Sequence, residues 1–146
     1  MIHALSVASE AYPLVKTGGL ADVVGALPDA LAPHGVATTT LLPGYPKVLA
    51  HIGDVAVAHQ WPSLLGVEAR LLAGTLGEHP LLVLDAPALF AREGGPYADA
   101  GGRDWDDNWR RFAALSKAAA EVASGTAGER RFDLCLLYTS PSPRDS

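Results

Sequence analysis

Lys16-Thr17-Gly18-Gly19-Leu20 is the stretch around which the rest of this sequence is organised. It follows the apolar run 2–8, which is short and bounded by polar residues, as a buried parallel strand would be. From Leu20 to Leu31, apolar residues recur at the i, i+3, i+4, i+7 spacing of a helix that packs on a sheet. The stretch is therefore predicted to be a strand-to-helix turn, which is where nucleotides usually bind.

The residues of this turn suit a phosphate or a diphosphate. Gly18 and Gly19 let the backbone come close to a ligand, and the free N–H groups at the start of a helix attract anions. Lys16 adds a mobile positive charge beside them. Without support from its flanks, a Gly-Gly pair before a helix is more often plain turn chemistry than a ligand site.

The remaining pattern indicates an α/β fold with a Rossmann-like parallel sheet and flanking helices. A second strand at 36–42 would complete a β-loop-α-β unit, whose crossover is right-handed in nearly all known cases. Further strands are predicted at residues 55–58, 67–72, 81–85 and 132–137, with a short helical turn at 86–90. We expect the strands 55–58 and 67–72, joined through Pro62 and Gly66, to form an antiparallel addition to the sheet.

Two helices are predicted from the apolar spacing and from the positions of proline and glycine. The helix that begins at Leu20 is expected to kink or restart at Pro28, because proline removes a backbone donor. A long helix is predicted from about Trp105 to Ser124, with Gly125 as its stop. Its apolar face should include Trp105 and Trp109, which we expect to pack in the core.

The composition narrows the classes of protein and partner. The chain has 146 residues, 49% hydrophobic and 18% charged, which suits one globular domain. A net charge of -5 with scattered basic residues argues against nucleic acid as a partner. The single Cys135 cannot form an internal disulfide, and no secretion signal or membrane-spanning apolar run is present, so we expect a cytoplasmic protein with no membrane partner. No metal-ligand spacing occurs, and neither a metal nor a cofactor is expected.

Several rival functions lack their motifs. A dinucleotide-binding oxidoreductase would need Gly-x-Gly-x-x-Gly after its first strand. A P-loop NTPase would place its lysine after the last glycine, whereas Lys16 precedes both glycines. The Gly-x-Ser-x-Gly of an α/β-hydrolase is absent from the sequence.

The flanks of the Gly-Gly turn give a more specific indication. Residues 9–28, which read SEAYPLVKTGGLADVVGALP, resemble the amino-terminal signature of bacterial glycogen synthases and plant starch synthases. The resemblance continues at residues 42–46, 84–87, 95–97 and 107–113, and covers the chain from Met1 to about Asp133. It implies an incomplete amino-terminal domain of a two-domain glycosyltransferase. Such enzymes transfer glucose from ADP-glucose to the non-reducing end of an α-1,4-glucan such as glycogen.

The resemblance also implies roles for individual residues. Lys16 would hold the diphosphate of ADP-glucose, and Gly18 and Gly19 would allow close backbone approach. Asp22 would orient the loop or the sugar. Glu10 and Tyr97, on loops expected to face one cleft, would contact the sugar or the glucan, and no catalytic residue is carried over.

The end of the chain departs from the family. After Asp133 the family continues with a strand and a His-Ala-His-Asp-Trp run, and residues 134–146 do not contain this run. We therefore expect a family domain at 1–133 and a tail at 134–146 that is disordered or not biological sequence. Such a fragment should be inactive alone, and the alternative is a stand-alone anion- or glucan-binding module.

Overall fold

Four parallel strands form the centre of the fold. The structure is a computed structural model that describes residues 1–10, 19–92, 96–99, 101–128 and 131–138. Its parallel strands are β1 (Ile2–Val7), β2 (Val36–Pro43), β5 (His79–Asp85) and β6 (Leu134–Leu137). With β3 (Gly53–Leu64) and β4 (Val67–Leu76), the described residues form one sheet in the order β3-β4-β5-β2-β1-β6. The predicted α/β class is confirmed.

Strands β3 and β4 form a hairpin at one edge of this sheet. They pair with each other and β4 pairs with β5, in both cases antiparallel, which confirms the predicted antiparallel addition. The predicted connection is right for Gly66, which forms the turn with Leu65, and wrong for Pro62, which lies inside β3. Both turn residues have positive φ, 51° and 89°, which suits a tight hairpin. Pro62 is tolerated because β3 is an edge strand.

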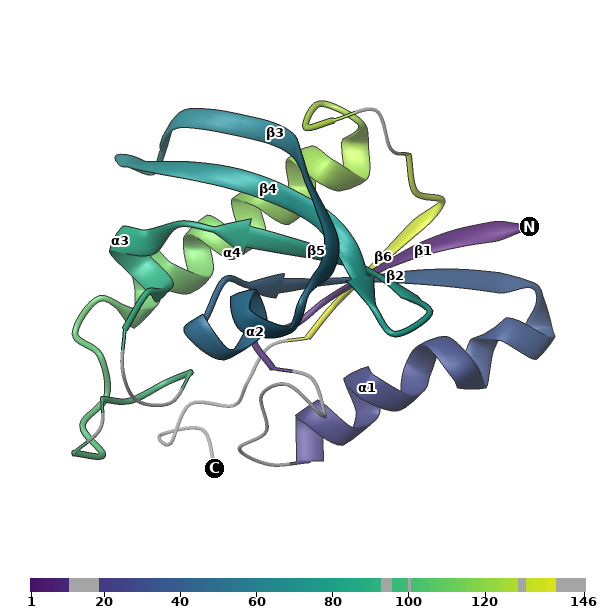
Figure 1. Cartoon of the computed structure of the whole chain (residues 1–146), viewed down its shortest axis with the longest axis horizontal. Helices are drawn as coiled ribbons and strands as arrows, with labels where there is room; N and C mark the ends of the chain where they lie inside the picture. Colours follow the sequence, from purple (N-terminus) through teal and green to yellow (C-terminus); the bar gives the residue numbers. More distant parts are fainter. Residues whose placement is uncertain (11–18, 93–95, 100, 129–130, 139–146) are drawn as a thin grey trace.

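Helices cover both faces of the central strands (Figure 1). Helix α1 (Gly19–Leu31), the 3₁₀ turn η1 (Ala32–His34) and α2 (Pro46–His51) precede the hairpin. Helices α3 (Pro87–Phe90) and α4 (Asn108–Ser124) follow β5, and α1 and α4 lie on opposite sides of β1 and β2. Residues 4–7 of β1 are buried without interruption, as expected for a parallel strand covered on both faces.

Helix α1 does not restart at Pro28. It continues through this residue to Leu31 and passes into η1, which Gly35 ends with a φ of 81°. The Gly35 N–H donates to the Ala32 carbonyl at 3.1 Å. Glycine adopts this left-handed conformation without strain, so Gly35 ends the 3₁₀ turn that follows α1.

Helix α4 differs from the prediction at its amino-terminal end. It begins at Asn108 instead of Trp105, although Gly125 ends it as expected, with a φ of 83°. The prediction that Trp109 packs in the core is wrong, because its side chain is 72% exposed. The buried face consists of Arg111, Ala114, Leu115, Ala118, Ala119 and Val122. Trp109 precedes Arg111 by two residues, which is about 200° around a helix axis, and therefore points away from the sheet.

The strand order places a switch point at β1. The chain leaves β1 through α1 to reach β2 on one side, and β6 later joins β1 on the other side. Ligands of open α/β sheets bind outside the carboxyl ends of strands at such a point. Strand β6 agrees with the strand predicted at 132–137, whereas the boundary at 133 stays a prediction and residues 139–146 lie outside the described residues. No helix in the described ranges is long and apolar enough to cross a membrane.

Candidate functional site

Buried polar side chains gather at the carboxyl edge of the sheet. Glu10 follows β1, Tyr45 follows β2, and Asp85 ends β5, and these parallel strands end at the same edge. The three residues are only 2%, 7% and 6% exposed. Burying polar groups is unfavourable unless they have partners, so their clustering marks this edge as the candidate site.

Tyr97 joins this edge from a distant part of the chain. Its hydroxyl lies 2.5 Å from the hydroxyl of Ser9, the residue next to Glu10. Its carbonyl accepts hydrogen bonds from the Trp105 N–H at 3.2 Å and from Asn108 Nδ2 at 2.8 Å. Its ring packs at a tilt on Phe112, with 5.8 Å between centroids. The structure therefore brings the predicted Tyr97 beside the loop of the predicted Glu10.

Tyr45 lies in the same buried region. Its ring packs edge-on against Phe90 at 5.8 Å, and its hydroxyl has no hydrogen-bond partner among the described residues. Burial raises the pKa of Tyr45 well above its usual range, the nearby Arg111 opposes this, and Tyr97 and Glu10 add to it. The phenol is therefore neutral and close to the groups that form the edge.

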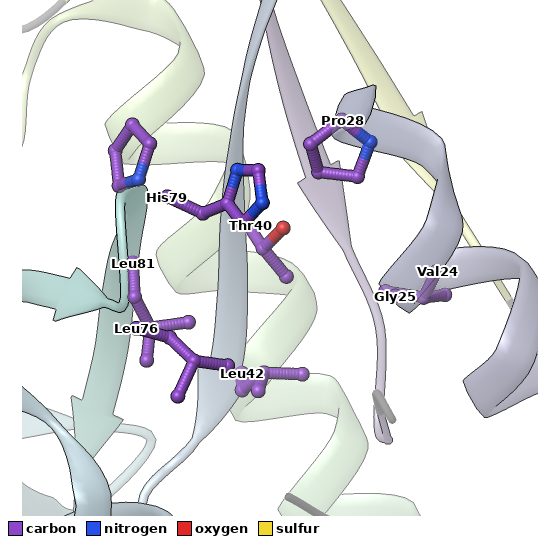
Figure 2. Close-up of a pocket in the computed structure, with 9 residues that line it drawn as sticks. Val24, Gly25, Pro28, Thr40, Leu42, Leu76, His79 and Leu81 are labelled. Atoms are coloured by element: carbon purple, nitrogen blue, oxygen red, sulfur yellow. The ribbon is translucent and has the colours of Figure 1, made fainter. Parts of the chain in front are cut away.

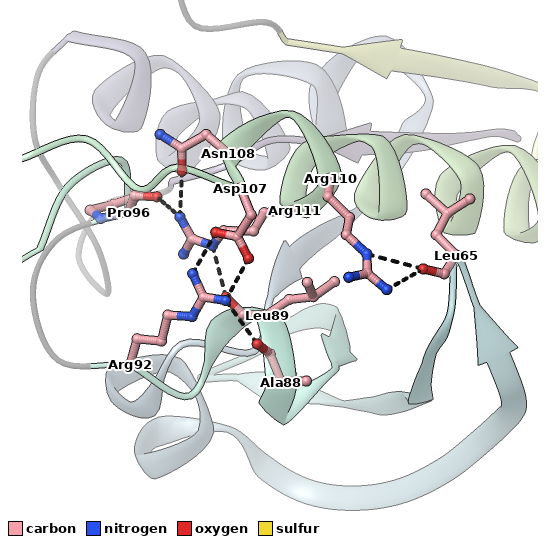
Figure 3. A network of polar contacts seen from close by, with 9 residues as sticks. All are labelled: Leu65, Ala88, Leu89, Arg92, Pro96, Asp107, Asn108, Arg110 and Arg111. Carbon is pink, nitrogen blue, oxygen red and sulfur yellow. Dashed lines mark hydrogen bonds and ion pairs between the residues drawn. The ribbon is translucent and has the colours of Figure 1, made fainter.

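Arg111 of α4 joins the segments next to this region by hydrogen bonds (Figure 3). It is 1% exposed, and its guanidinium donates to the Leu89 carbonyl at 2.8 Å, the Pro96 carbonyl at 2.9 Å and Asn108 Oδ1 at 2.8 Å. Aromatic rings of Phe90, Trp105 and Phe112 surround it, with centroids 5.4 to 5.6 Å away. Burial lowers the pKa of Arg111 from its ordinary value.

An ion pair connects the two ends of the loop between α3 and α4. Arg92 donates to both carboxylate oxygens of Asp107, each at 2.7 Å, and also to the Ala88 carbonyl at 2.9 Å. The Arg92 guanidinium lies 5.0 Å from the centroid of the Trp105 ring. Hydrogen bonding by Arg92 holds the pKa of Asp107 below its usual range.

The predicted anion-binding end is described only in part. Lys16 and Gly18 lie outside the described residues. Gly19 is the first residue of α1, so the predicted helix start is confirmed. Asp22 lies in the first turn of α1 with an exposed side chain, where a carboxylate interacts favourably with the helix dipole.

Three residues of the site were not predicted from the sequence. Tyr45, Asn108 and Arg111 hold or border Tyr97, yet none was singled out as a site residue. Arg111 had a detectable signal, because it precedes Leu115 and Val122 at helical spacing and is therefore a charged residue on an apolar face. Tyr45 had no such signal, since a tyrosine after a strand is common in any turn.

A small hollow elsewhere does not belong to this site. It lies between α1, β2 and the start of β5, and has a volume of about 40 Å³ (Figure 2). Its lining is mostly apolar, with Thr40 and His79 as polar members. That volume is far too small for a nucleotide sugar. Among the described residues, no three His, Cys, Asp or Glu side chains gather to hold a metal ion.

Comparisons with known proteins agree on one family. The family described as starch synthase catalytic domain matches residues 3–136. The glycogen synthase of Novosphingobium aromaticivorans is 64% identical over 133 residues, covering 91% of this chain and 27% of the relative. Glycogen synthase 1 of Rhizobium meliloti is 62% identical over 122 residues, covering 84% of this chain and 25% of the relative. The chain thus spans about a quarter of the length of these relatives.

A solved structure has the same fold. The catalytic domain of Starch Synthase IV from Arabidopsis thaliana, bound to ADP and acarbose, is similar with a TM-score of 0.69 and 25% sequence identity. The match covers 92% of this chain and 27% of that chain. The similarity extends over nearly all of the sheet and helices described above.

Proposed function

Because this chain belongs to the family of starch synthase catalytic domains, we propose that it forms the amino-terminal part of a glycogen synthase. The full enzyme would transfer glucose from ADP-glucose to the non-reducing end of an α-1,4-glucan. The observation that carries this proposal is the 64% identity to the Novosphingobium glycogen synthase over 133 residues. The ADP bound to the Arabidopsis structure supports an ADP-containing donor. The cytoplasmic location and the absence of nucleic-acid and membrane partners stay predictions.

The donor would bind where β1 passes into α1. Helix α1 begins at Gly19, and the N–H groups at the start of a helix favour a diphosphate. Lys16 and Gly18 precede this helix start directly in the sequence. When glucose leaves, negative charge develops on ADP, and a fixed cation beside backbone donors stabilises that charge.

The sugar or the glucan would lie against the buried carboxyl edge. The carboxylate of Glu10 and the hydroxyl of Tyr97 are suited to hydrogen bonds with sugar hydroxyl groups. The contact of Tyr97 with Ser9 supports a common role, since it holds both loops at one place. Asp22, in the first turn of α1, would orient the loop or the sugar.

A chimera tests the proposal. The aligned 133 residues of the Novosphingobium enzyme are exchanged for the matching residues of this chain, and glucose transfer from radiolabelled ADP-glucose to glycogen is measured. We expect transfer at a rate within about tenfold of the Novosphingobium parent, because residues at the site should be interchangeable. A chimera that is folded and binds glycogen or ADP-glucose but transfers nothing would support the stand-alone binding module instead.

Lys16→Ala in this chimera tests the donor site. We expect kcat/KM for ADP-glucose to fall about 10- to 100-fold, because a charge-assisted contact contributes roughly 1.5–3 kcal/mol. Lys117→Ala is the matched control, since Lys117 is half exposed and, among the described residues, pairs only with Glu121 of its own helix at 3.6 Å. Equal kinetics for the two variants would contradict the role of Lys16.

A further inference from the structure

The buried arginine of α4 has an unusual set of partners. Arg111 is 1% exposed, yet among the described residues no carboxylate lies within salt-bridge distance of it. Its three acceptors, the carbonyls of Leu89 and Pro96 and the amide oxygen of Asn108, are all neutral. A buried guanidinium is retained only where hydrogen bonds and aromatic faces replace its hydration. Here those bonds join α3, the loop before α4 and α4 itself.

Two of these contacts converge on the backbone that carries Tyr97. Arg111 holds the Pro96 carbonyl, and Asn108 holds the next carbonyl, that of Tyr97. The side-chain amide of Asn108 links Arg111 to Tyr97, since its oxygen accepts a hydrogen bond from Arg111 while its nitrogen donates one to the Tyr97 carbonyl. The two peptide groups that flank Tyr97 are thereby fixed, with the Tyr97 hydroxyl beside Ser9.

We propose that Arg111, acting through Asn108, is a positioning residue that holds Tyr97 in place to bind the sugar or glucan substrate. This inference rests on the proposed function, because it needs Tyr97 to contact the substrate. Arg111 does not touch the substrate in this scheme. Its planar guanidinium donates in three directions at once, a geometry that the single ammonium group of a lysine does not reproduce.

The neighbouring Arg110 provides a matched control. It lies on the same helix, and its guanidinium donates through Nε at 3.1 Å and Nη2 at 2.7 Å to the carbonyl of Leu65 in the β3–β4 turn (Figure 3). Arg110→Lys therefore loses a guanidinium contact to a backbone carbonyl, but one that leads away from Tyr97. A general weakening of α4 would affect both arginine variants alike.

The first measurement uses the 146-residue chain and needs no activity. The Trp105 N–H donates to the Tyr97 carbonyl, so its hydrogen exchange reports whether that carbonyl stays in place. We expect Arg111→Lys and Asn108→Asp to raise this exchange rate at least tenfold, and Arg110→Lys to leave it unchanged. Asn108→Asp keeps an acceptor for Arg111, lacks the donor to Tyr97, and places a carboxylate at the favourable start of α4, so it should stay folded. Unchanged exchange in folded Asn108→Asp would overturn the inference.

The second measurement uses the chimera with the Novosphingobium enzyme. Asn108→Asp and Arg111→Lys should each raise the KM for glycogen or ADP-glucose about tenfold, with a smaller change in kcat. Combining either with Tyr97→Phe should add little to Tyr97→Phe alone, because both changes remove the same contact. Fully multiplicative effects, or an effect of Arg110→Lys as large as that of Arg111→Lys, would overturn the inference. An inactive chimera with native residues would instead overturn the proposed function, and the exchange measurement would still decide whether the loop is held.

Discussion

At the scale of single residues, the hydroxyl of Tyr45 is a buried polar group that lacks a hydrogen bond to the described residues. It is buried and has no hydrogen-bond partner among the described residues, which costs roughly 1–3 kcal/mol. Tyr45→Phe removes this oxygen and keeps the ring packed on Phe90. We expect the free energy of unfolding of the 146-residue chain to rise by about 1 kcal/mol, measured by urea denaturation. A fall of that size would mean that the hydroxyl has a partner in solution.

Some residues of the candidate site can be predicted from the sequence, and others cannot. The family resemblance implied Glu10 and Tyr97 as site residues, and the structure places Tyr97 against Ser9, the neighbour of Glu10. Arg111 and Asn108 were not predicted, because their importance comes from which carbonyls they reach across the fold. A sequence shows that an arginine interrupts an apolar face, but it does not show that the arginine meets Leu89 and Pro96.

At the scale of elements, the ion pair between Arg92 and Asp107 connects the end of α3 to the start of α4. Both groups are partly exposed, at 23% and 35%, so solvent screens the pair. We expect Asp107→Asn to lower the free energy of unfolding by about 0.5 kcal/mol at pH 7. Because the folded pKa of Asp107 is lowered, its contribution is present above the unfolded value near 3.9 and is lost as the pH falls through the folded value.

The measurement for Asp107 is a series of urea titrations from pH 7 down to pH 3. The difference between the native chain and Asp107→Asn should shrink as the pH falls below about 4. Asp106→Asn is the matched control, since Asp106 is exposed and forms no ion pair with the residues that the structure describes. A difference that is constant with pH would show that Asp107 acts through packing or helix capping and not through its charge.

The elements also show where periodicity is informative and where it is not. The strands and the end of α4 at Gly125 were predicted, because apolar spacing and the conformational freedom of glycine are local properties. The start of α4 and the exposure of Trp109 were not predicted correctly. An aromatic residue next to the apolar face of a helix can point either toward the core or toward solvent. The position of Pro62 inside β3 depends on that strand being an edge, which no local pattern encodes.

At the scale of the whole molecule, the order of the sheet gives the site its place. Pairing of β1 with β6 depends on contacts between residues more than 100 positions apart, such as the hydrogen bond from Asp133 N–H to the His3 carbonyl at 2.7 Å. The first β-loop-α-β unit was predictable from sequence, whereas the join to β6 required the fold. Ligands of open α/β sheets bind beyond the carboxyl ends of the strands at such a switch point.

This arrangement predicts that the 146-residue chain alone transfers no glucose. Glu10 and Tyr97 lie on one edge of one sheet, and the chain spans only 27% of the Novosphingobium relative. Transfer needs donor and acceptor held together, and that positioning can account for many orders of magnitude in rate. With radiolabelled ADP-glucose and glycogen, we expect the purified chain to be at least about 1,000-fold slower than the chimera. Circular dichroism must first show a cooperative thermal transition, so that an unfolded chain is not mistaken for an inactive one. Glucan elongation by the folded chain at a rate near that of the chimera would mean that the carboxyl edge of this sheet is a complete active site.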